Sequence, residues 1–179
     1  YHGEAAQLRA AWKNPDLIFN DAAIPTKQER LNTTLPGLRH PAYEQKVIDF
    51  YLFFAESTAG TILYFAKEMK RLTNDNLLCG AFYGYVFMYS AFADYSLQHS
   101  GHLALDKILD CEQIDFLCSP SYYCDRQLGT GYTTTMSAAE SLKLHNKLWL
   151  HENAEGTALV PQWSHGKVST IAETVSYQR

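Results

Sequence analysis

The sequence lacks the short motifs that mark the commonest nucleotide-binding and serine-hydrolase sites. It contains no G-x-G-x-x-G, no G-x-x-x-x-G-K-S/T and no G-x-S-x-G. These motifs would mark a dinucleotide enzyme, a P-loop NTPase and a serine hydrolase of the α/β-hydrolase type. All three classes are therefore without support in this sequence.

Positive charge is also scarce. The chain has 15 Lys and Arg residues against 19 Asp and Glu residues, a net charge of -4 at pH 7. The basic residues are scattered, so they form no stripe along which a phosphate backbone could bind. We therefore expect no nucleic-acid partner.

Long hydrophobic runs are missing as well. The longest uncharged run, residues 77–93, contains glycine, serine and several tyrosines. It is shorter than the roughly 20 apolar residues that span a membrane. No basic start followed by an apolar segment opens the chain, as a secretion signal would. We expect no membrane partner.

The four cysteines form neither a C-x-x-C pair nor the spacing of a zinc finger or ribbon; they are Cys79, Cys111, Cys118 and Cys124. We interpret them as reduced and mostly buried thiols, which are typical of a reducing compartment, so a cytoplasmic protein is expected. His102 and His145 have no companion at ligand spacing and are expected to pack or to be solvated. The sequence predicts no metal and no other cofactor.

What the chain does have is apolar material, with 46% hydrophobic and 13% aromatic residues in 179. This is enough for one globular segment with a sizeable core, and no second domain is indicated. A long excursion at 16–40 separates the first helix from the rest. The periodicity and the turn residues predict these elements: helix 5–12, helix 42–71, strand 77–85, helix 101–110, strand 114–119, helix 137–146, strand 147–152 and a helix that begins near Thr170.

Helices and strands alternate, which predicts an α/β fold with parallel strands and right-handed crossovers. The loops after the strands are long and those before them are short. This favours a partial (β/α)₈ TIM barrel of about three strands, with residues 1–179 as its later part and both ends cut within helices. A small open parallel sheet is the alternative architecture.

Glu152 is the candidate catalytic residue, because the strand 147–152 ends on it before a loop begins. The carboxyl ends of parallel strands are where active sites gather in such folds. The other predicted interpretation of Glu152 is an ordinary solvated loop glutamate.

Other side chains that suit a sugar are expected at the same edge of the sheet. Aromatic faces stack on a pyranose, and polar groups bond its hydroxyls. Each residue also has a structural interpretation, such as an aromatic residue that faces the helices. The predicted substrate-binding residues are Tyr83, Tyr85, Tyr123, Asp125, Arg126 and Trp149.

Three stretches of the chain carry a family resemblance: 100–105, then 114–120 with Tyr123, Asp125 and Arg126, then 144–149 with Glu152. They resemble bacterial glycoside hydrolases, namely family 42 β-galactosidases and similar barrels. Upstream, 8–12 and 23–25 with Glu29 and Arg30 look like the same proteins in the same order. The resemblance covers nearly all of the chain.

The resemblance implies a (β/α)₈ barrel that hydrolyses glycosides with retention. In that family an acid/base glutamate follows strand four and a nucleophilic glutamate follows strand seven. Glu152 would take the nucleophile's place, and the acid/base would lie before Tyr1. The relatives often carry Arg-Thr after the glutamate, whereas this chain has Gly156 and Thr157. A cation that could position Glu152 is thereby missing.

Three functions follow as hypotheses. The first is retaining hydrolysis of a carbohydrate substrate of the β-galactoside type. The second is a non-catalytic carbohydrate-binding or structural barrel segment. The third is a scaffold that associates with copies of itself or with the missing part of the barrel, since an isolated array of three strands exposes its edges.

Overall fold

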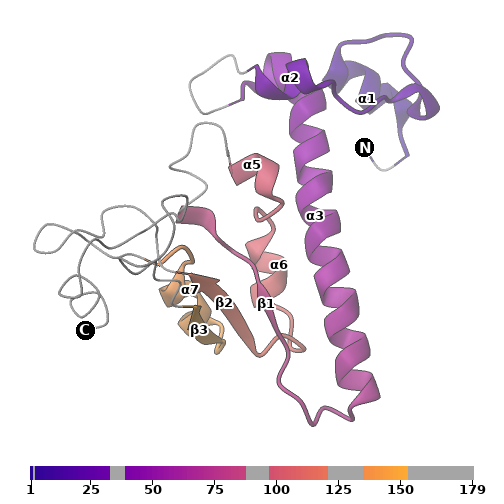
Figure 1. Cartoon of the computed structure of the whole chain (residues 1–179). Coiled ribbons are helices and arrows are strands. Elements are labelled where there is room, and N and C mark those ends of the chain that lie inside the picture. Colours follow the sequence, from indigo (N-terminus) through magenta and orange to yellow (C-terminus); the bar gives the residue numbers. More distant parts are fainter. Residues whose placement is uncertain (2, 33–38, 88–96, 121–134, 153–179) are drawn as a thin grey trace, which may run out of the picture.

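The computed structural model describes residues 1, 3–32, 39–87, 97–120 and 135–152. A long helix stands beside a small sheet, with shorter helices around both (Figure 1). The elements are α1 (Ala5–Trp12), η1 (Phe19–Asp21), α2 (Lys27–Leu31), α3 (Pro41–Leu72), β1 (Gly80–Phe82), α5 (Leu97–Ser100), α6 (Leu105–Leu109), β2 (Phe116–Pro120), α7 (Ala139–Leu144) and β3 (Leu148–Glu152).

The three strands form one open sheet in the order β1-β2-β3, and both neighbouring pairs are parallel. The connections contain α6 and α7, as right-handed parallel crossovers do. The α/β class and the parallel strands predicted from the sequence are therefore confirmed. In the described part of the chain, no helix is both long and apolar enough to cross a membrane.

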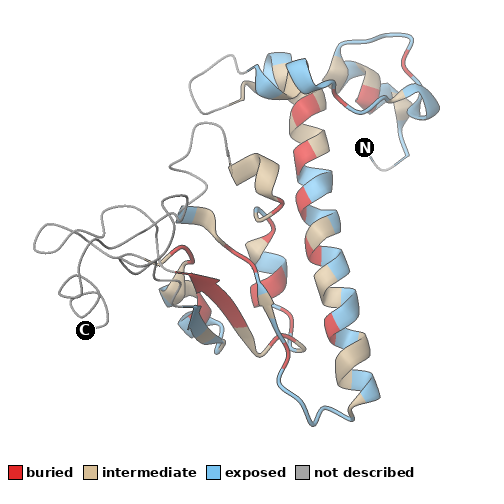
Figure 2. Cartoon of the chain, viewed as in Figure 1, coloured by how far each residue is buried: buried red, intermediate tan, exposed pale blue. Residues whose placement is uncertain are grey.

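Helix α3 packs against α1, α5 and α6 and shares the core cluster with the sheet. Proline occupies its first turn, where no backbone donor is lost. Buried positions recur at helical spacing along α3 (Figure 2), and several of them are alanines, which allow close packing against neighbouring helices. Its buried residues are Val47, Tyr51, Ala55, Ala59 and Ala66. The core therefore lies between α3 and the sheet.

One face of the sheet carries this core. Side chains alternate along a strand, so the register partners Ala81, Leu117 and Trp149 share a face. They pack in one cluster with buried residues of α3, α6 and α7. Right-handed crossovers agree with this, because they put α6 and α7 on the same side of a sheet with this strand order. The described helices therefore cover one face only.

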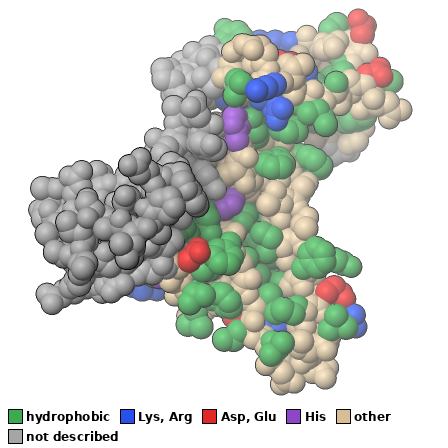
Figure 3. Space-filling view, in the orientation of Figure 1, with side chains coloured by type: hydrophobic (Ala, Val, Ile, Leu, Met, Phe, Trp, Pro, Cys, Tyr) green, Lys and Arg blue, Asp and Glu red, His purple; other side chains and the backbone are tan. Residues whose placement is uncertain are grey.

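The opposite face of the sheet presents large apolar side chains to solvent. Phe82 is 60% exposed, Leu148 is 61% exposed and Leu150 is 54% exposed. Figure 3 shows hydrophobic side chains gathered over the strands and the second half of α3. Apolar runs such as 77–85 and 148–150 are typical of strands that are covered on both faces. This interpretation is wrong for β1 and β3, since no described helix covers this face. It is confirmed for β2, which is buried from Leu117 to Pro120.

Polar contacts tie the amino ends of the strands to the helices. The Lys70 ammonium lies 2.8 Å from Asp115, whose carboxylate also accepts a 2.6 Å hydrogen bond from the Cys79 backbone N–H. Lys147 donates to the carbonyls of Cys111 and Ile114 at 2.6 and 2.8 Å. This end of the sheet is therefore devoted to stability, as in parallel α/β folds generally.

Two helix starts differ from the sequence prediction. Ser137 and Glu140 stand at capping-box spacing, which predicts the helix start at Ser137. They form no such box, because α7 begins at Ala139 and the buried Ser137 hydroxyl has no hydrogen-bond partner among the described contacts. Conversely, Thr26 and Glu29 form a capping box at the start of α2, inside the segment predicted to be irregular. Lys46 and this cap lower the pKa of Glu29 to about 2.

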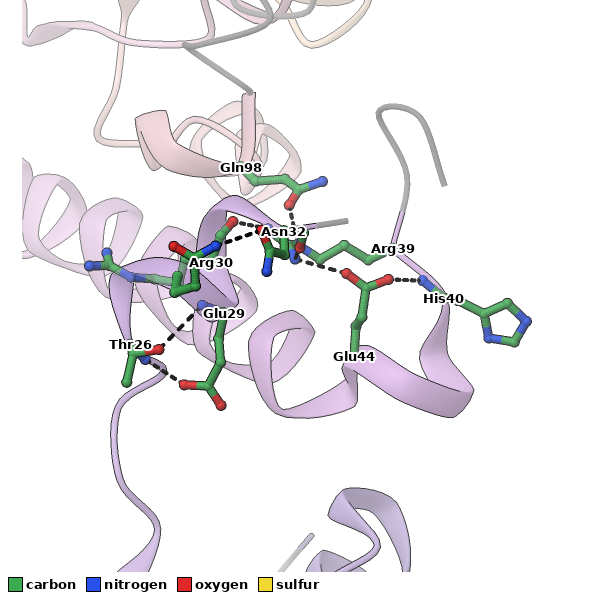
Figure 4. Close-up of polar contacts among 9 residues, drawn as sticks. Thr26, Glu29, Arg30, Asn32, Arg39, His40, Glu44 and Gln98 are labelled. Carbon is green, nitrogen blue, oxygen red and sulfur yellow. Dashed lines mark hydrogen bonds and ion pairs between the residues drawn. The ribbon is translucent and has the colours of Figure 1, made fainter. Parts of the chain in front are cut away.

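Arg39 joins the amino-terminal region to the rest of the molecule (Figure 4). Its guanidinium, only 4% exposed, lies 3.0 Å from Glu44 at the start of α3 and donates to Gln98 of α5 at 2.8 Å. It also donates to the backbone carbonyls of Arg30 and Asn32. Because all these partners compensate the buried charge, Arg39 can fasten α2, α3 and α5 together.

Candidate active site

Glu152 ends β3 opposite Pro120 of β2. Alternation puts its side chain on the exposed face of the sheet, with Leu148 and Leu150 and away from the helices. Burial, and after it the negative charge of Glu152, raises the pKa of the Cys118 thiol. The Glu152 carboxylate is therefore on the same face as Cys118 of the middle strand and close enough for its charge to act on that thiol.

A row of backbone contacts extends this edge from β3 toward β1. The carbonyl of Pro120, beside Glu152, accepts a 3.4 Å hydrogen bond from the Met136 N–H. The Met136 carbonyl in turn accepts one from the Phe87 N–H at 3.1 Å. Met136 thereby joins the segment that follows β1 to the end of β2, where Pro120 is the register partner of Glu152.

Tyr83 lies just after β1 but is part of the core. Its side chain is 1% exposed, and its hydroxyl donates a 2.7 Å hydrogen bond to the Gly101 carbonyl. Burial raises its pKa to about 12. This position corrects the expectation that Tyr83 contacts a sugar, because both its ring and its hydroxyl are engaged within the protein.

Trp149 faces the helices. It lies on the strand face of Leu117, and its indole N–H donates a 3.1 Å hydrogen bond to the buried Ser119 hydroxyl. Its ring stacks on His151 with centroids 5.1 Å apart. Since Trp149 and Glu152 are three residues apart on one strand, they point to opposite faces, so Trp149 does not contact a sugar held by Glu152.

Tyr85 is half-buried and lies in the segment that joins the row through Phe87. Its ring meets that of His102 edge-on at 4.9 Å. The backbone N–H groups of Gly84 and Tyr85 both donate to Nδ1 of His102, at 3.1 and 3.0 Å. The role of Tyr85 in substrate binding stays a prediction, since its described contacts are with His102.

Tyr123, Asp125 and Arg126 lie outside the described residues. Their predicted role in substrate binding stays a prediction. Of the four cysteines, Cys79, Cys111 and Cys118 are free and buried, as expected from their spacing, and Cys124 also lies outside the described residues. Within the described ranges, no group of three or more His, Cys, Asp or Glu residues could hold a metal ion.

Sequence reasoning missed the structural importance of His102. The histidine was expected merely to pack or be solvated, but it accepts two backbone hydrogen bonds at the end of β1. Burial lowers its pKa to about 4. The available signal was the adjacent Gly101, which adopts a positive φ of 77° and lets the chain turn sharply into His102.

Comparisons of the chain with models of protein families, with curated proteins and with solved structures found no match in any of the three. Function must therefore be argued from the residues and their geometry.

Proposed function

We propose that this chain is part of a (β/α)₈ barrel and that the protein hydrolyses glycosidic bonds with retention of configuration. In such a barrel, consecutive parallel strands lie side by side and all the helices lie outside. The strand order β1-β2-β3 and the single helix-covered face support this architecture. A doubly wound open sheet carries helices on both faces, one face for each of its βαβαβ halves, so three consecutive strands fit one such half as well.

The observation that carries the proposal is the position of Glu152. It ends β3 at the carboxyl edge, on the face turned away from the core cluster. In a closed barrel this face is the interior, and this edge is where catalytic residues lie. The exposed apolar residues Phe82, Leu148 and Leu150 would then line the barrel interior, which is packed with large side chains.

Glu152 would act as the nucleophile. Its carboxylate attacks the anomeric carbon while a second carboxylic acid protonates the leaving oxygen, and a glycosyl ester forms. Water, deprotonated by that same second group, then displaces Glu152 and restores the original configuration. We assign the acid/base to a residue before Tyr1, and the resemblance to family 42 β-galactosidases suggests a β-galactoside substrate. Tyr85 would contribute an aromatic contact, and Tyr123, Asp125 and Arg126 polar ones.

A non-catalytic carbohydrate-binding or structural segment is the second candidate. Retaining hydrolysis needs two carboxyl groups about 5 Å apart. Among the described residues within the three strands or directly after them, Glu152 is the one carboxylate. This count favours binding without cleavage, unless a residue outside the described ranges supplies the second group.

Hydrolysis of a panel of aryl β-glycosides by the full-length protein tests the proposal. We compare the unaltered protein with Glu152→Gln and with a matched control, Glu140→Gln. Glu140 lies on α7, where it is exposed and pairs only with Lys143 among the described contacts. The two substitutions remove the same charge, but only the first removes the proposed nucleophile.

We expect Glu152→Gln to lower kcat at least about 1,000-fold, because the covalent step is lost. Glu140→Gln should retain activity within about twofold, and NMR of the released sugar should show retained configuration. Full activity in Glu152→Gln would rule out the nucleophile. Sugar binding without turnover by the unaltered protein would favour the second candidate.

A further inference from the structure

The His102 ring lies at the carboxyl end of β1, although His102 follows Gly84 by 18 residues in the sequence. Its backbone N–H donates a 3.1 Å hydrogen bond to the Ser100 hydroxyl, which itself donates to the Leu97 carbonyl at 2.6 Å. The end of α5 thereby fixes the backbone of His102. The imidazole is consequently presented to β1 in a defined orientation.

Two glycines allow this close approach. Gly101 has φ +77°, and a Cβ there would lie 2.9 Å from the Thr58 hydroxyl of α3. Gly84 has φ +85°, and a Cβ there would lie 2.9 Å from a Leu105 methyl of α6. Other residues would be both strained and crowded at these positions. Glycine at both positions therefore allows the Gly84–Tyr85 backbone to contact the His102 ring.

The ring is held on three sides. The Tyr83 ring stacks on it with centroids 4.6 Å apart and the Tyr85 ring meets it edge-on at 4.9 Å. Nδ1 accepts from the N–H groups of both Gly84 and Tyr85. A nitrogen that accepts two hydrogen bonds carries no proton, so the imidazole is neutral with its proton on Nε2.

We propose that His102 is a positioning residue: Nδ1 holds the Gly84 and Tyr85 amides and so sets the orientation of the Tyr85 ring just after the carboxyl end of β1. Tyr85 lies two residues before Phe87, whose N–H joins the backbone row through Met136 and Pro120. The inference rests on the proposed function only where it makes Tyr85 a sugar contact. The clamp itself is independent of catalysis.

Protonation of His102 must open the clamp, because it would set an N–H against two other N–H donors. Burial lowers the His102 pKa from 6.5 to about 4, so the clamp holds throughout the neutral range. Among the described ring contacts of His102, the titratable side chains are Tyr83 and Tyr85. Burial, and to a lesser extent the charge of Asp106 of α6, raises the pKa of Tyr83. The clamp should therefore open only below about pH 4.

Substitution of His102 by Asn or Gln tests the role of the Nδ1 acceptor independently of the other atoms of the imidazole ring. The Asn oxygen occupies nearly the place of Nδ1, whereas the Gln oxygen reaches the place of Nε2. His102→Asn should therefore keep both amide hydrogen bonds, and His102→Gln should lose them at similar polarity. Asn does not titrate, so its clamp should also persist below pH 4.

The test follows the ¹⁵N–¹H signals of Gly84 and Tyr85 in the full-length protein from pH 7 to below pH 4. We expect both amides to shift together with the His102 ring signals in the unaltered protein, and to stay constant in His102→Asn. Amides that ignore the His102 titration, or that are equally displaced in the Asn and Gln variants, would overturn the positioning role.

The contribution to sugar recognition is read separately from KM on the best aryl β-glycoside. We expect His102→Gln to raise KM about tenfold with a smaller change in kcat, and His102→Asn to stay within about twofold. Equal KM values in the two variants would refute the contact between Tyr85 and the sugar. If the unaltered protein turns over no glycoside, the proposed function fails, while the amide titration still decides the clamp.

Discussion

Gly80 of β1 faces Phe116 of β2, and this contact limits which residue can occupy position 80. The two are register partners, and a Cβ on Gly80 would lie 2.3 Å from the Phe116 ring. The ring therefore occupies the volume that a side chain at 80 would need. This glycine serves close packing rather than an unusual backbone conformation.

Gly80→Ala should destabilise the protein by about 1–3 kcal/mol, because the Phe116 ring must leave its position. Gly60→Ala is the control: Gly60 lies in α3 with nothing within 4 Å of a Cβ, and alanine there should stabilise by about 0.5–1 kcal/mol. Denaturant unfolding gives both values. A neutral Gly80→Ala would show that Phe116 does not cover Gly80.

Residue identity alone could not separate Tyr83 from Tyr85. Both follow the same apolar run, and each was predicted to contact substrate. The difference arises because the Gly101 carbonyl, 18 positions along the chain, accepts the Tyr83 hydroxyl. Such a partner is fixed by tertiary packing, whereas Glu152 could be placed from the local end of a strand.

Among the elements, helix α3 is tied to the strands at their amino ends by a shared carboxylate. Burial alone would raise the pKa of Asp115, but hydrogen bonds from Lys70 and the Cys79 N–H, with the charges of Lys70 and Lys147, outweigh it and lower the pKa. The ionised carboxylate is therefore favoured by folding.

Asp115→Asn should lower the denaturant midpoint at pH 7, because Lys70 loses its ion pair with the less exposed carboxylate. Among the described contacts it keeps the ion pair with the exposed Asp75. Since the folded pKa of Asp115 is lowered, its stabilisation is present above the unfolded value of 3.8 and is lost as the pH falls through the folded value. The difference between variant and unaltered protein should thus shrink in acid. A difference that stays constant from pH 7 to pH 3 would contradict this role.

The first strand was harder to predict than the long helix or the other two strands, which were predicted at 114–119 and 147–152 against Phe116–Pro120 and Leu148–Glu152. The helical period of α3 gave its bounds almost correctly, at 42–71 against Pro41–Leu72. The apolar run 77–85 predicted a long, doubly covered strand, but only Gly80–Phe82 pairs, and Phe82 is exposed. An apolar run carries no period, so it cannot tell a helix-covered face from an open one.

At the scale of the whole molecule, the described helices pack on one face of the sheet and leave open the other face, which exposes Phe82, Leu148 and Leu150. The open face is what a barrel interior requires, and it also carries Glu152 at its carboxyl edge. The sequence predicted the alternation of elements and hence this parallel array. It could not predict which face of β3 each side chain takes, because that depends on the pairing with β2.

The most direct measurement is covalent labelling of the full-length protein with a 2-deoxy-2-fluoro β-galactoside that has a good leaving group. The fluorine slows hydrolysis of the glycosyl-enzyme ester, so a retaining enzyme accumulates it on the nucleophile. We predict one added fluorosugar in the intact mass, located at Glu152 by peptide fragmentation and absent from Glu152→Gln. A label on another carboxylate, or active turnover with inversion and no label, would contradict Glu152 as the nucleophile.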